Sequence, residues 1–507
     1  MLATIATAVV QGVDGHPVTV EVHVSNGLPG YTLVGLPDAS CRESRDRVRA
    51  AVLSSGFKWP DRRVTINLAP TGLRKQGAAL DLPIALGVLA ASGQLEGVEL
   101  RRFGAVGELG LDGSIRPVPG LVSLADAVAA DDILVPADGA EQAAVVRAGR
   151  VRGVRTLGRL LAGLLGHEPL PAVVEKGDGV EALAAARTGD LSDVRGQPMA
   201  RWALEISAAG GHHLLMVGPP GAGKTMLASR LVGLLPDLDP AEALLATRVH
   251  SAAGLAIPAG GLVRRPPFRS PHQGASAVAM IGGGSAAMRP GEISCAHGGV
   301  LFLDELGEFS VPILDALRQP LEEGVIRVSR AARAVTLPAR FLLVAAMNPC
   351  PCGDGATNGR CRCSDSARAR YSRRLSGPLL DRFDLRLEVH PPTPSILLGG
   401  SEEESSAMVA DRVLRVRERS LARGVRCNAD LPAARLDDVA PISVAARRLL
   451  RQVLERGELT GRGLYRVRTV ARTIGDLRDD DDLVSVDHVQ AALALRSLPK
   501  AVFGIAS

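Results

Sequence analysis

Leu214–Thr225 reads LLMVGPPGAGKT, a short apolar run that leads directly into a glycine-rich segment ending in Lys-Thr. The apolar run is typical of a buried strand, and Met226–Leu234 follows with helix-forming residues. Glycines in this setting let backbone N–H groups curl around a polyphosphate, and the N-terminus of the next helix adds positive potential. Because a chance glycine-rich turn would lack both flanking elements, the stretch predicts a phosphate-binding loop in an α/β domain.

Within this loop the last two residues have distinct expected roles. Lys224 would bridge the β- and γ-phosphates of ATP, and the Thr225 hydroxyl would ligate Mg²⁺. ATP and Mg²⁺ are therefore the predicted cofactors. The residues expected to surround the nucleotide are Gly218, Pro219, Pro220, Gly221, Ala222, Gly223, Lys224 and Thr225.

A second apolar strand, Val300–Leu303, ends in Asp304-Glu305. A carboxylate at a strand end opposite a phosphate loop can complete the Mg²⁺ site, which is the role predicted for Asp304. Glu305 would orient the attacking water or accept its proton. In isolation these two residues would be a solvated acidic turn, but beside a phosphate loop the catalytic interpretation is favoured.

Two further polar residues follow at longer range. Asn348 ends the apolar run Phe341–Met347 and could orient the lytic water, although an Asn before Pro349 is also a common turn residue. Arg382 could stabilise transition-state charge on the nucleotide of a neighbouring subunit. Its alternative role is an ion pair within the chain, with Asp381 or Asp384 as the partner.

The order of these features, a phosphate loop, an acidic strand end, an Asn-tipped strand and a late Arg, is that of AAA+ ATPases. Across nearly the whole chain the sequence resembles the magnesium-chelatase-like ComM/YifB family. The segments that carry the resemblance are Gly35–Ala39, Asn67–Pro70, Gly196-Gln197, Pro290–Ser294, Val300–Leu306, Asn348–Gly353, Leu375–Arg382 and Arg466–Ile474.

This resemblance implies a homo-hexameric ATPase ring that translocates on single-stranded or branched DNA. In the family the activity serves branch migration during recombination, notably in natural transformation. By position, the resemblance makes Asn348 the first sensor and Arg382 a finger acting in trans. Arg462 is similar to the second sensor, with Arg466 as a nearby competitor.

The segment Ile326–Val335 predicts a β-hairpin with Arg330 and Arg333 near its tip. In related motors such a hairpin points into the ring pore, where the two arginines could grip phosphates. Its alternative is a solvated turn. Arg269 lies where a second pore loop is expected, and Phe268 beside it could stack on bases or simply be buried.

Four of the seven cysteines are grouped in two Cys-x-Cys pairs, Cys350/Cys352 and Cys361/Cys363. Four thiolates can hold a tetrahedral Zn²⁺, although the spacing within each pair is tighter than in zinc ribbons. We therefore predict a structural zinc beside the first sensor, with free thiols or a redox-labile pair as the alternative.

The front of the chain resembles the Lon-protease-like, ribosomal S5-type fold. Where Lon proteases carry a nucleophilic Ser, this sequence has Ala79, and no Lys occurs between Lys75 and Lys176 to act as base. The resemblance thus implies a proteolytically inactive domain. Ring assembly or DNA contact is its expected work, with Arg74 and Lys75 as candidates for the latter.

Composition agrees with a multidomain globular chain of 507 residues with a formal charge of +5. Without a long unbroken apolar run or a basic leader, the chain is expected to be cytoplasmic, with no membrane partner. Of 59 basic residues, 54 are Arg, which suits phosphate contacts but also reflects codon usage. The expected units are an S5-type α+β domain over 1–175, a linker over 176–192, an AAA+ α/β domain over 193–391 that includes the cysteine loop 350–363, and a helical lid over 392–507.

Three other functions compete with DNA translocation. A chelatase-type motor would remodel a protein partner, but the front domain and the cysteine loop are not chelatase features. An ATP-dependent protease is disfavoured by Ala79. A non-translocating scaffold would have an ATPase rate that does not respond to DNA.

Overall fold

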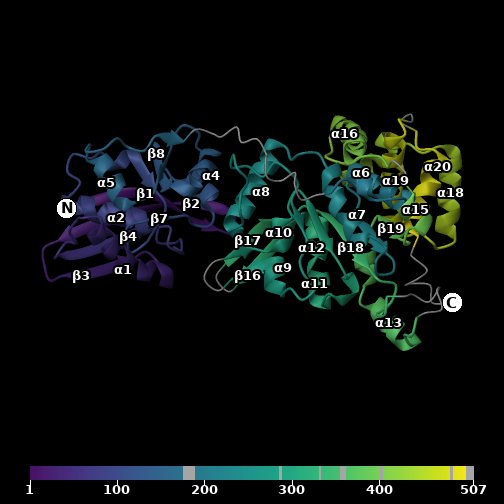
Figure 1. The fold of residues 1–507 in the computed structure, drawn as a ribbon, viewed down its shortest axis with the longest axis horizontal. Helices are drawn as coiled ribbons and strands as arrows, with labels where there is room; N and C mark the ends of the chain where they lie inside the picture. Colours follow the sequence, from purple (N-terminus) through teal and green to yellow (C-terminus); the bar gives the residue numbers. More distant parts are fainter. Residues whose placement is uncertain are drawn as a thin grey trace.

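The computed structural model describes residues 1–174, 189–284, 288–330, 333–353, 361–399, 403–479 and 483–497, leaving aside the side chains of residues 329, 330 and 333. Two sheet-centred units and a group of C-terminal helices follow one another along the long axis of the molecule (Figure 1). The expected mixed α/β fold class is confirmed.

The front unit is built on an eight-stranded mixed sheet in the order β10-β9-β8-β5-β1-β2-β4-β3. In β2 and β4 buried apolar side chains alternate with more exposed ones, so each strand buries one face. The strands are β1 (Leu2–Gln11), β2 (Asp14–Ser25), β3 (Gly30–Val34), β4 (Arg63–Ala69), β5 (Phe103–Ala105), β8 (Asp132–Pro136), β9 (Val151–Val154) and β10 (Val173–Val174).

The helices of this unit bury apolar surface against the sheet. α2 is apolar on all sides and is almost entirely buried, because the sheet covers one flank and α1 the other. α1 buries Val48, Ala51 and Val52 on one side, and Asp38 is its N-cap. The helices are α1 (Ala39–Ser54), α2 (Asp81–Ala91), α3 (Leu121–Ala127), α4 (Ala140–Ala144) and α5 (Leu157–Leu164).

One expectation for the front unit is wrong. Lys75 was a candidate for DNA contact, but its side chain is fully buried and Nζ donates to the carbonyl oxygen of Pro70. Burial lowers the pKa of Lys75. The neighbouring Arg74 is exposed. No local pattern indicated this burial, because a single Lys in a glycine-rich stretch has no periodicity that would place it in a core.

The central unit has a five-stranded parallel sheet in the order β12-β15-β18-β11-β19. Its strands are β11 (Leu214–Val217), β12 (Phe268–Arg269), β15 (Val300–Leu303), β18 (Leu342–Met347) and β19 (Leu385–Glu388). Successive residues of β11 enter the cores on opposite faces: Leu214 packs with the C-terminal helices, and Leu215 packs on the side of α8. Since all five strands run the same way, their carboxyl ends share one edge.

Short helices surround this sheet. They are α6 (Pro198–Gly210), α7 (Lys224–Leu231), α8 (Pro240–Ala253), α9 (Ala277–Ile281), α10 (Glu292–Cys295), α11 (Val311–Ala316), α12 (Arg318–Glu323), α13 (Asp365–Arg373), α14 (Gly377–Leu380) and α15 (Pro394–Leu398). The expected hairpin is formed by β16 (Val325–Arg330) and β17 (Arg333–Pro338), and a smaller ribbon by β13 (Gly282–Gly283) and β14 (Arg289–Pro290).

The C-terminal helices share a hydrophobic core with one face of the central sheet. α16 lies against α6, where Arg412 of α16 pairs with the buried Glu205 at 2.5 Å. These helices therefore pack on the central unit rather than forming a separate body. They are α16 (Ser406–Ala422), α17 (Leu436–Val439), α18 (Val444–Glu455), α19 (Gly461–Leu477) and α20 (Val486–Arg496).

The front and central units meet along α3 and α8. The Gly120 backbone N–H donates to the Ser251 carbonyl oxygen at 2.8 Å, and Arg248 pairs with Asp126 at 2.6 Å. The turn between β1 and β2 also enters this interface, since Val13 is buried in the core that contains Val335 of β17. The front unit is thus in direct contact with the hairpin. The expected domain boundaries stay predictions, and residues 176–188 of the expected linker lie outside the described part of the chain.

Candidate nucleotide site

The sheet topology brings three predicted site segments to one edge. The phosphate loop follows β11, Asp304-Glu305 follows β15, and Asn348 follows β18. Because β15, β18 and β11 are adjacent and parallel, their carboxyl ends lie side by side. This is the position at which open α/β sheets bind ligands.

The loop has the backbone conformation that a phosphate cradle requires. Gly221 and Gly223 have φ of +76° and +84°, a region that favours glycine, and α7 begins directly at Lys224. Lys224 is buried, and its Nζ donates to the carbonyl oxygens of Gly218 at 2.7 Å and Pro219 at 2.9 Å. These neutral acceptors are ones that an anionic phosphate oxygen could replace with a stronger, charge-assisted bond.

Lys224 also connects the loop to the neighbouring strand, since Nζ lies 3.2 Å from Asn348 Oδ1. Burial lowers the pKa of Lys224, and the nearby carboxylates of Asp304 and Glu305 act in the opposite direction. Asn348 therefore faces the phosphate loop directly, which is the position from which an amide can sense a γ-phosphate.

The donor set for a divalent cation is assembled at the same edge. Thr225 Oγ1 donates to Asp304 Oδ2 at 2.7 Å, and the Glu305 backbone N–H donates to Asp304 Oδ1 at 2.9 Å. A hydroxyl and a carboxylate in contact suit Mg²⁺, which takes one or two protein oxygens and completes its shell with phosphate and water. Glu305 has φ of +53°, an uncommon conformation for a side chain other than Gly, and is exposed at the site.

Gln197 is a site residue to which the sequence assigned no role. Its φ is +54°, and its Nε2 donates to the Ala222 carbonyl oxygen at 2.9 Å, which fixes the back of the loop. Gln197 also lines a cavity of about 490 Å³ beside the loop, together with Arg386, Glu388 and Leu495. The signal that could have located it is Gly196-Gln197 just before the helix that packs on the loop strand.

Arg382 lies at the other end of the strands, where the amino ends of β11 and β19 are found. It precedes β19, and the Asp384 backbone N–H donates to the His213 carbonyl oxygen just before β11. A strand of four residues spans about 13 Å, so β11 separates this position from the phosphate loop of the same chain. The alternative role, an ion pair within the chain, does occur, although with neither expected partner: the guanidinium contacts Glu322, and Nη1 donates to the Pro378 carbonyl oxygen at 3.2 Å.

Arg382 is part of a cluster of cations. Burial lowers its pKa, and the neighbouring charges of Arg466, Arg462 and Arg318 lower it further. The two competing second-sensor residues therefore lie near Arg382 and not near the phosphate loop. They differ in environment: Arg466 is paired with the buried carboxylate of Asp384, whereas Arg462, at the start of α19, is exposed.

The candidate DNA contacts have different surroundings. Arg269 forms a two-pronged ion pair with Glu292, both bonds at 2.7 Å, so its guanidinium is already occupied. Phe268 stacks on Phe302 with ring centroids 5.9 Å apart and is partly buried, the commoner of its two expected outcomes. Arg330 and Arg333 pair across the hairpin through their backbones, and their side chains lie outside the described part of the chain.

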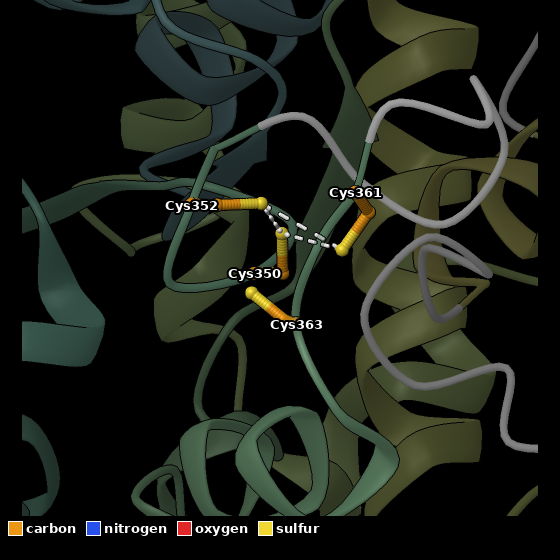
Figure 2. Close-up of side chains that lie close together, drawn as sticks. All are labelled: Cys350, Cys352, Cys361 and Cys363. Atoms are coloured by element: carbon orange, nitrogen blue, oxygen red, sulfur yellow. Dashed lines mark hydrogen bonds between the residues drawn. The ribbon is translucent and has the colours of Figure 1, made fainter.

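The four clustered cysteines converge in space (Figure 2). Their sulfur atoms all lie within 4.8 Å of one another, although the two pairs come from separate segments. The three remaining cysteines, Cys41, Cys295 and Cys427, are buried singly in other parts of the fold. The cluster could therefore hold a metal ion, which matches the predicted ligand set.

No helix in the described part of the chain combines the length and the apolar character needed to cross a membrane.

Family models match three parts of the sequence. They are described as magnesium chelatase subunit ChlI over residues 190–396, subunit ChlI of Mg-chelatase over 20–138, and the ChlI C-terminal part over 403–496. The match over 20–138 contradicts the expectation that the front domain is not a chelatase feature.

Two full-length similarities are close. The chain is 45% identical to the uncharacterized protein YifB of Escherichia coli (strain K12), and 43% identical to the competence protein ComM of Haemophilus influenzae, with 98% of each chain covered in both cases. Partial similarities extend to the probable DNA helicase MCM9 of Arabidopsis thaliana, 25% identical over 205 residues. Lon protease 2 of Bacillus subtilis is 31% identical over 154 residues. The similarity to MCM9 covers 40% of this chain and 25% of MCM9. The similarity to Lon protease 2 covers 27% of this chain and 26% of that protease.

Proposed function

The chain belongs to the ComM/YifB family of magnesium-chelatase-like AAA+ ATPases, and from this premise we propose that it is an ATP-driven DNA translocase. It assembles as a homo-hexameric ring and acts on single-stranded or branched DNA. Its work is branch migration in homologous recombination, including the recombination that follows DNA uptake. The observation that carries the proposal is the placement of Lys224 and Arg382 at opposite ends of neighbouring strands: Lys224 follows the carboxyl end of β11, and Arg382 precedes the amino end of β19.

In the proposed site each residue at the phosphate-loop edge has one task. Lys224 binds the β- and γ-phosphates, and Thr225 with Asp304 holds Mg²⁺, which neutralises phosphate charge when bound. Glu305 orients water and accepts its proton, while Asn348 reports on the γ-phosphate. The cavity beside Gln197 accommodates the nucleoside.

Assembly follows from what a single chain lacks. Arg382 is a strand length away from its own phosphate loop, so it meets a γ-phosphate only when a second subunit docks on that edge. Arg462 is near Arg382 and exposed, and we assign it to the same junction. Hydrolysis at a junction between subunits supports a ring in which each step moves one subunit against the next.

DNA as the substrate is supported by two observations. One relative is named a competence protein and another, at lower identity, a probable DNA helicase. The chain also presents the β16–β17 hairpin directly before β18, which ends at Asn348. A hairpin joined to the sensor strand can move with the nucleotide state, and we propose that Arg330 and Arg333 on it contact phosphates.

The test compares ATP hydrolysis with and without single-stranded and forked DNA, followed by branch migration on a four-way junction. The expected result is DNA-stimulated hydrolysis and movement of the junction, both abolished in Glu305→Gln. Hydrolysis that does not respond to DNA would favour a scaffold. Stimulation by a protein alone would favour a chelatase-type remodelling motor.

The four-cysteine cluster adds a second cofactor to the proposal. We assign to it one structural Zn²⁺, held by Cys350, Cys352, Cys361 and Cys363. Zinc accepts four thiolates in tetrahedral geometry and takes no part in redox chemistry, which suits a structural position.

A further inference from the structure

The four cysteine sulfur atoms have the spacing of a metal-bound set. The Sγ of Cys350 lies 3.2 Å from that of Cys352 and 3.6 Å from that of Cys361, and the last two are 3.6 Å apart. Ligands at 2.3 Å from a tetrahedral zinc would be separated by about 3.8 Å, whereas a disulfide needs about 2 Å. Cys363 points into the same centre (Figure 2). The separations therefore fit one shared cation better than a pair of disulfides.

The first segment of the cluster is continuous with the catalytic edge. Cys350 is buried and lies two residues after Asn348, whose Oδ1 accepts from Lys224 at 3.2 Å. A ligand fixed at Cys350 leaves only Pro349 between the metal and the sensor amide. The position of Asn348 relative to the phosphate loop thus depends on where this cysteine is held.

The same segment touches the phosphate loop itself. Gly353 has φ of +91°, and a Cβ built there would lie 2.8 Å from Cγ of Pro220. The backbone one residue beyond Cys352 is therefore packed directly on the loop. The Gly353 N–H also donates to the Cys350 carbonyl oxygen at 3.0 Å, so the turn that carries the first two ligands is closed on itself.

The second pair of cysteines leads to the turn that carries Glu305. Ser364 directly follows Cys363 and caps α13, accepting from the Ala367 backbone N–H at 3.3 Å. On this helix the buried Tyr371 packs against Gly307, where a Cβ would lie only 2.5 Å from the ring.

The contact between α13 and that turn is fixed at a second point. Arg374 at the end of α13 donates to the Gly307 carbonyl oxygen at 2.7 Å and contacts Glu308 at 3.0 Å. Gly307 is two residues after Glu305. The turn with the water-orienting carboxylate is therefore held by the helix that the second ligand pair begins.

We propose that Zn²⁺ bound by the four thiolates joins these segments, so that the metal sets the hydrolytic geometry of the ATP site. Without it, the Asn348 segment and α13 lose the link through the four thiolates and keep the weaker hydrogen bond between Tyr371 and the Asn348 backbone. ATP binding through Lys224 persists, because Lys224 and the positive-φ glycines Gly221 and Gly223 belong to the β11–α7 segment itself, and the cluster segment contacts this loop only at Pro220. Hydrolysis falls, because Asn348 and Glu305 lose their mutual position. This inference rests on the proposed ATPase function and on zinc as the ligand.

The test measures zinc content, nucleotide affinity and turnover in the full-length protein. We expect about one zinc per chain, lost in Cys363→Ser, with kcat lowered about tenfold or more and the Kd for a fluorescent ATP analogue little changed. Cys41→Ser is the matched control: it removes one buried thiol outside the cluster and should keep both zinc and turnover. A second measurement avoids mutation, since chelation should lower kcat and added Zn²⁺ should restore it.

The outcomes separate the two proposals. A protein that hydrolyses ATP but contains no zinc, or contains iron in its place, would overturn the metal assignment and leave the ATPase function intact. Zinc loss in Cys363→Ser with unchanged kcat would overturn the coupling. A zinc-loaded protein that never hydrolyses ATP would refute the proposed function, and with it the coupling, while the metal analysis still stands. Equal loss of ATP binding and hydrolysis would indicate a folding role and also overturn the inference.

Discussion

Lys224 and Asn348, 124 residues apart in sequence, lie 3.2 Å from each other through Nζ and Oδ1. The contact joins the phosphate loop to the adjacent strand end, and it places a neutral amide where the γ-phosphate would be recognised. In the proposed site, the side chains assigned to nucleotide binding and to nucleotide sensing therefore form one connected group.

Replacing Lys224 by Ala and Glu305 by Gln should separate binding from hydrolysis. Lys224→Ala removes the cation of the loop, so nucleotide affinity should fall. Glu305→Gln keeps the loop and the Mg²⁺ ligands, so ATP should still bind while turnover falls about 100-fold or more. Equilibrium binding of a labelled nucleotide and steady-state phosphate release measure the two effects. Normal hydrolysis in both variants would refute the assignment of the site.

Mixing two inactive variants should restore activity if Arg382 acts on a neighbouring subunit. Rings of Lys224→Ala alone or Arg382→Ala alone have no complete junction. In mixed rings, some junctions pair an intact phosphate loop from one subunit with an intact Arg382 from the other. Phosphate release should therefore reappear on mixing. Two folded variants that co-assemble and stay inactive would contradict action in trans.

Arg466 and Arg462 should have opposite phenotypes. Arg466→Ala leaves the Asp384 carboxylate buried without its guanidinium partner, which should cost about 3–5 kcal/mol of stability. Arg462→Ala removes an exposed side chain and should change stability by less than about 0.5 kcal/mol while lowering hydrolysis. Denaturant unfolding and phosphate release distinguish the two. A stable, inactive Arg466→Ala variant would make Arg466 the second sensor instead.

The contact of the front unit with the hairpin should be sensitive to Gly12. A Cβ at Gly12 would lie 2.4 Å from Cγ1 of Val335, and Gly12 has φ of +66°. Gly12→Ala should therefore lower stability through strain and overpacking, by about 2 kcal/mol or more. Gly56→Ala is matched in backbone, with φ of +84°, but has nothing within 4 Å of the new Cβ. Thermal unfolding of both variants isolates the packing component, and equal midpoints would contradict the interface.

Acid should destabilise the central unit through His297. Burial lowers its pKa to about 4, and the charges of Arg426 and Arg340 add to the effect. Its Nδ1 accepts from the Arg340 backbone N–H at 3.1 Å, so the folded state needs the neutral ring. The unfolded state binds a proton near pH 6.5, so stability should fall between about pH 6.5 and 4, by up to about 3 kcal/mol.

His297→Asn keeps an acceptor for that N–H but cannot titrate, so it should reduce the pH dependence of unfolding over this range by the contribution of one group, while His213, whose pKa burial also lowers to about 4, still titrates. His167→Asn, at an exposed position, is the control and should leave the dependence unchanged. If His297→Asn and the unaltered protein lost stability in parallel as the pH fell, His297 would not be the titrating group.

Several parts of the fold and site were predictable because their signals are local. The loop glycines, the strand before Lys224 and the acidic end of the Val300–Leu303 strand are short contiguous patterns, and each lies where the pattern indicated. The hairpin before β18 was also predictable from the sequence, because its two strands are adjacent in the chain. Family membership followed from the combined order of such segments.

Other parts depend on contacts that no local pattern encodes. Lys75 was misplaced on the surface because its burial arises from packing between several segments of the front unit. The second sensor was ambiguous because Arg462 and Arg466 lie one helical turn apart, and only the position of Asp384 at the foot of β19 distinguishes them.

The residues that bind phosphate in such a loop are contiguous in the chain. The amino-acid sequence alone therefore determined the nucleotide-binding motif and the family. Tertiary structure alone decided which groups share an edge of the sheet. It placed Arg382 away from its own loop, and it connected the four-cysteine cluster to the Glu305 turn through Tyr371 and Gly307. The physical reason is that strand direction and side-chain packing are set by the whole core, and residues distant in sequence meet only once that core has formed.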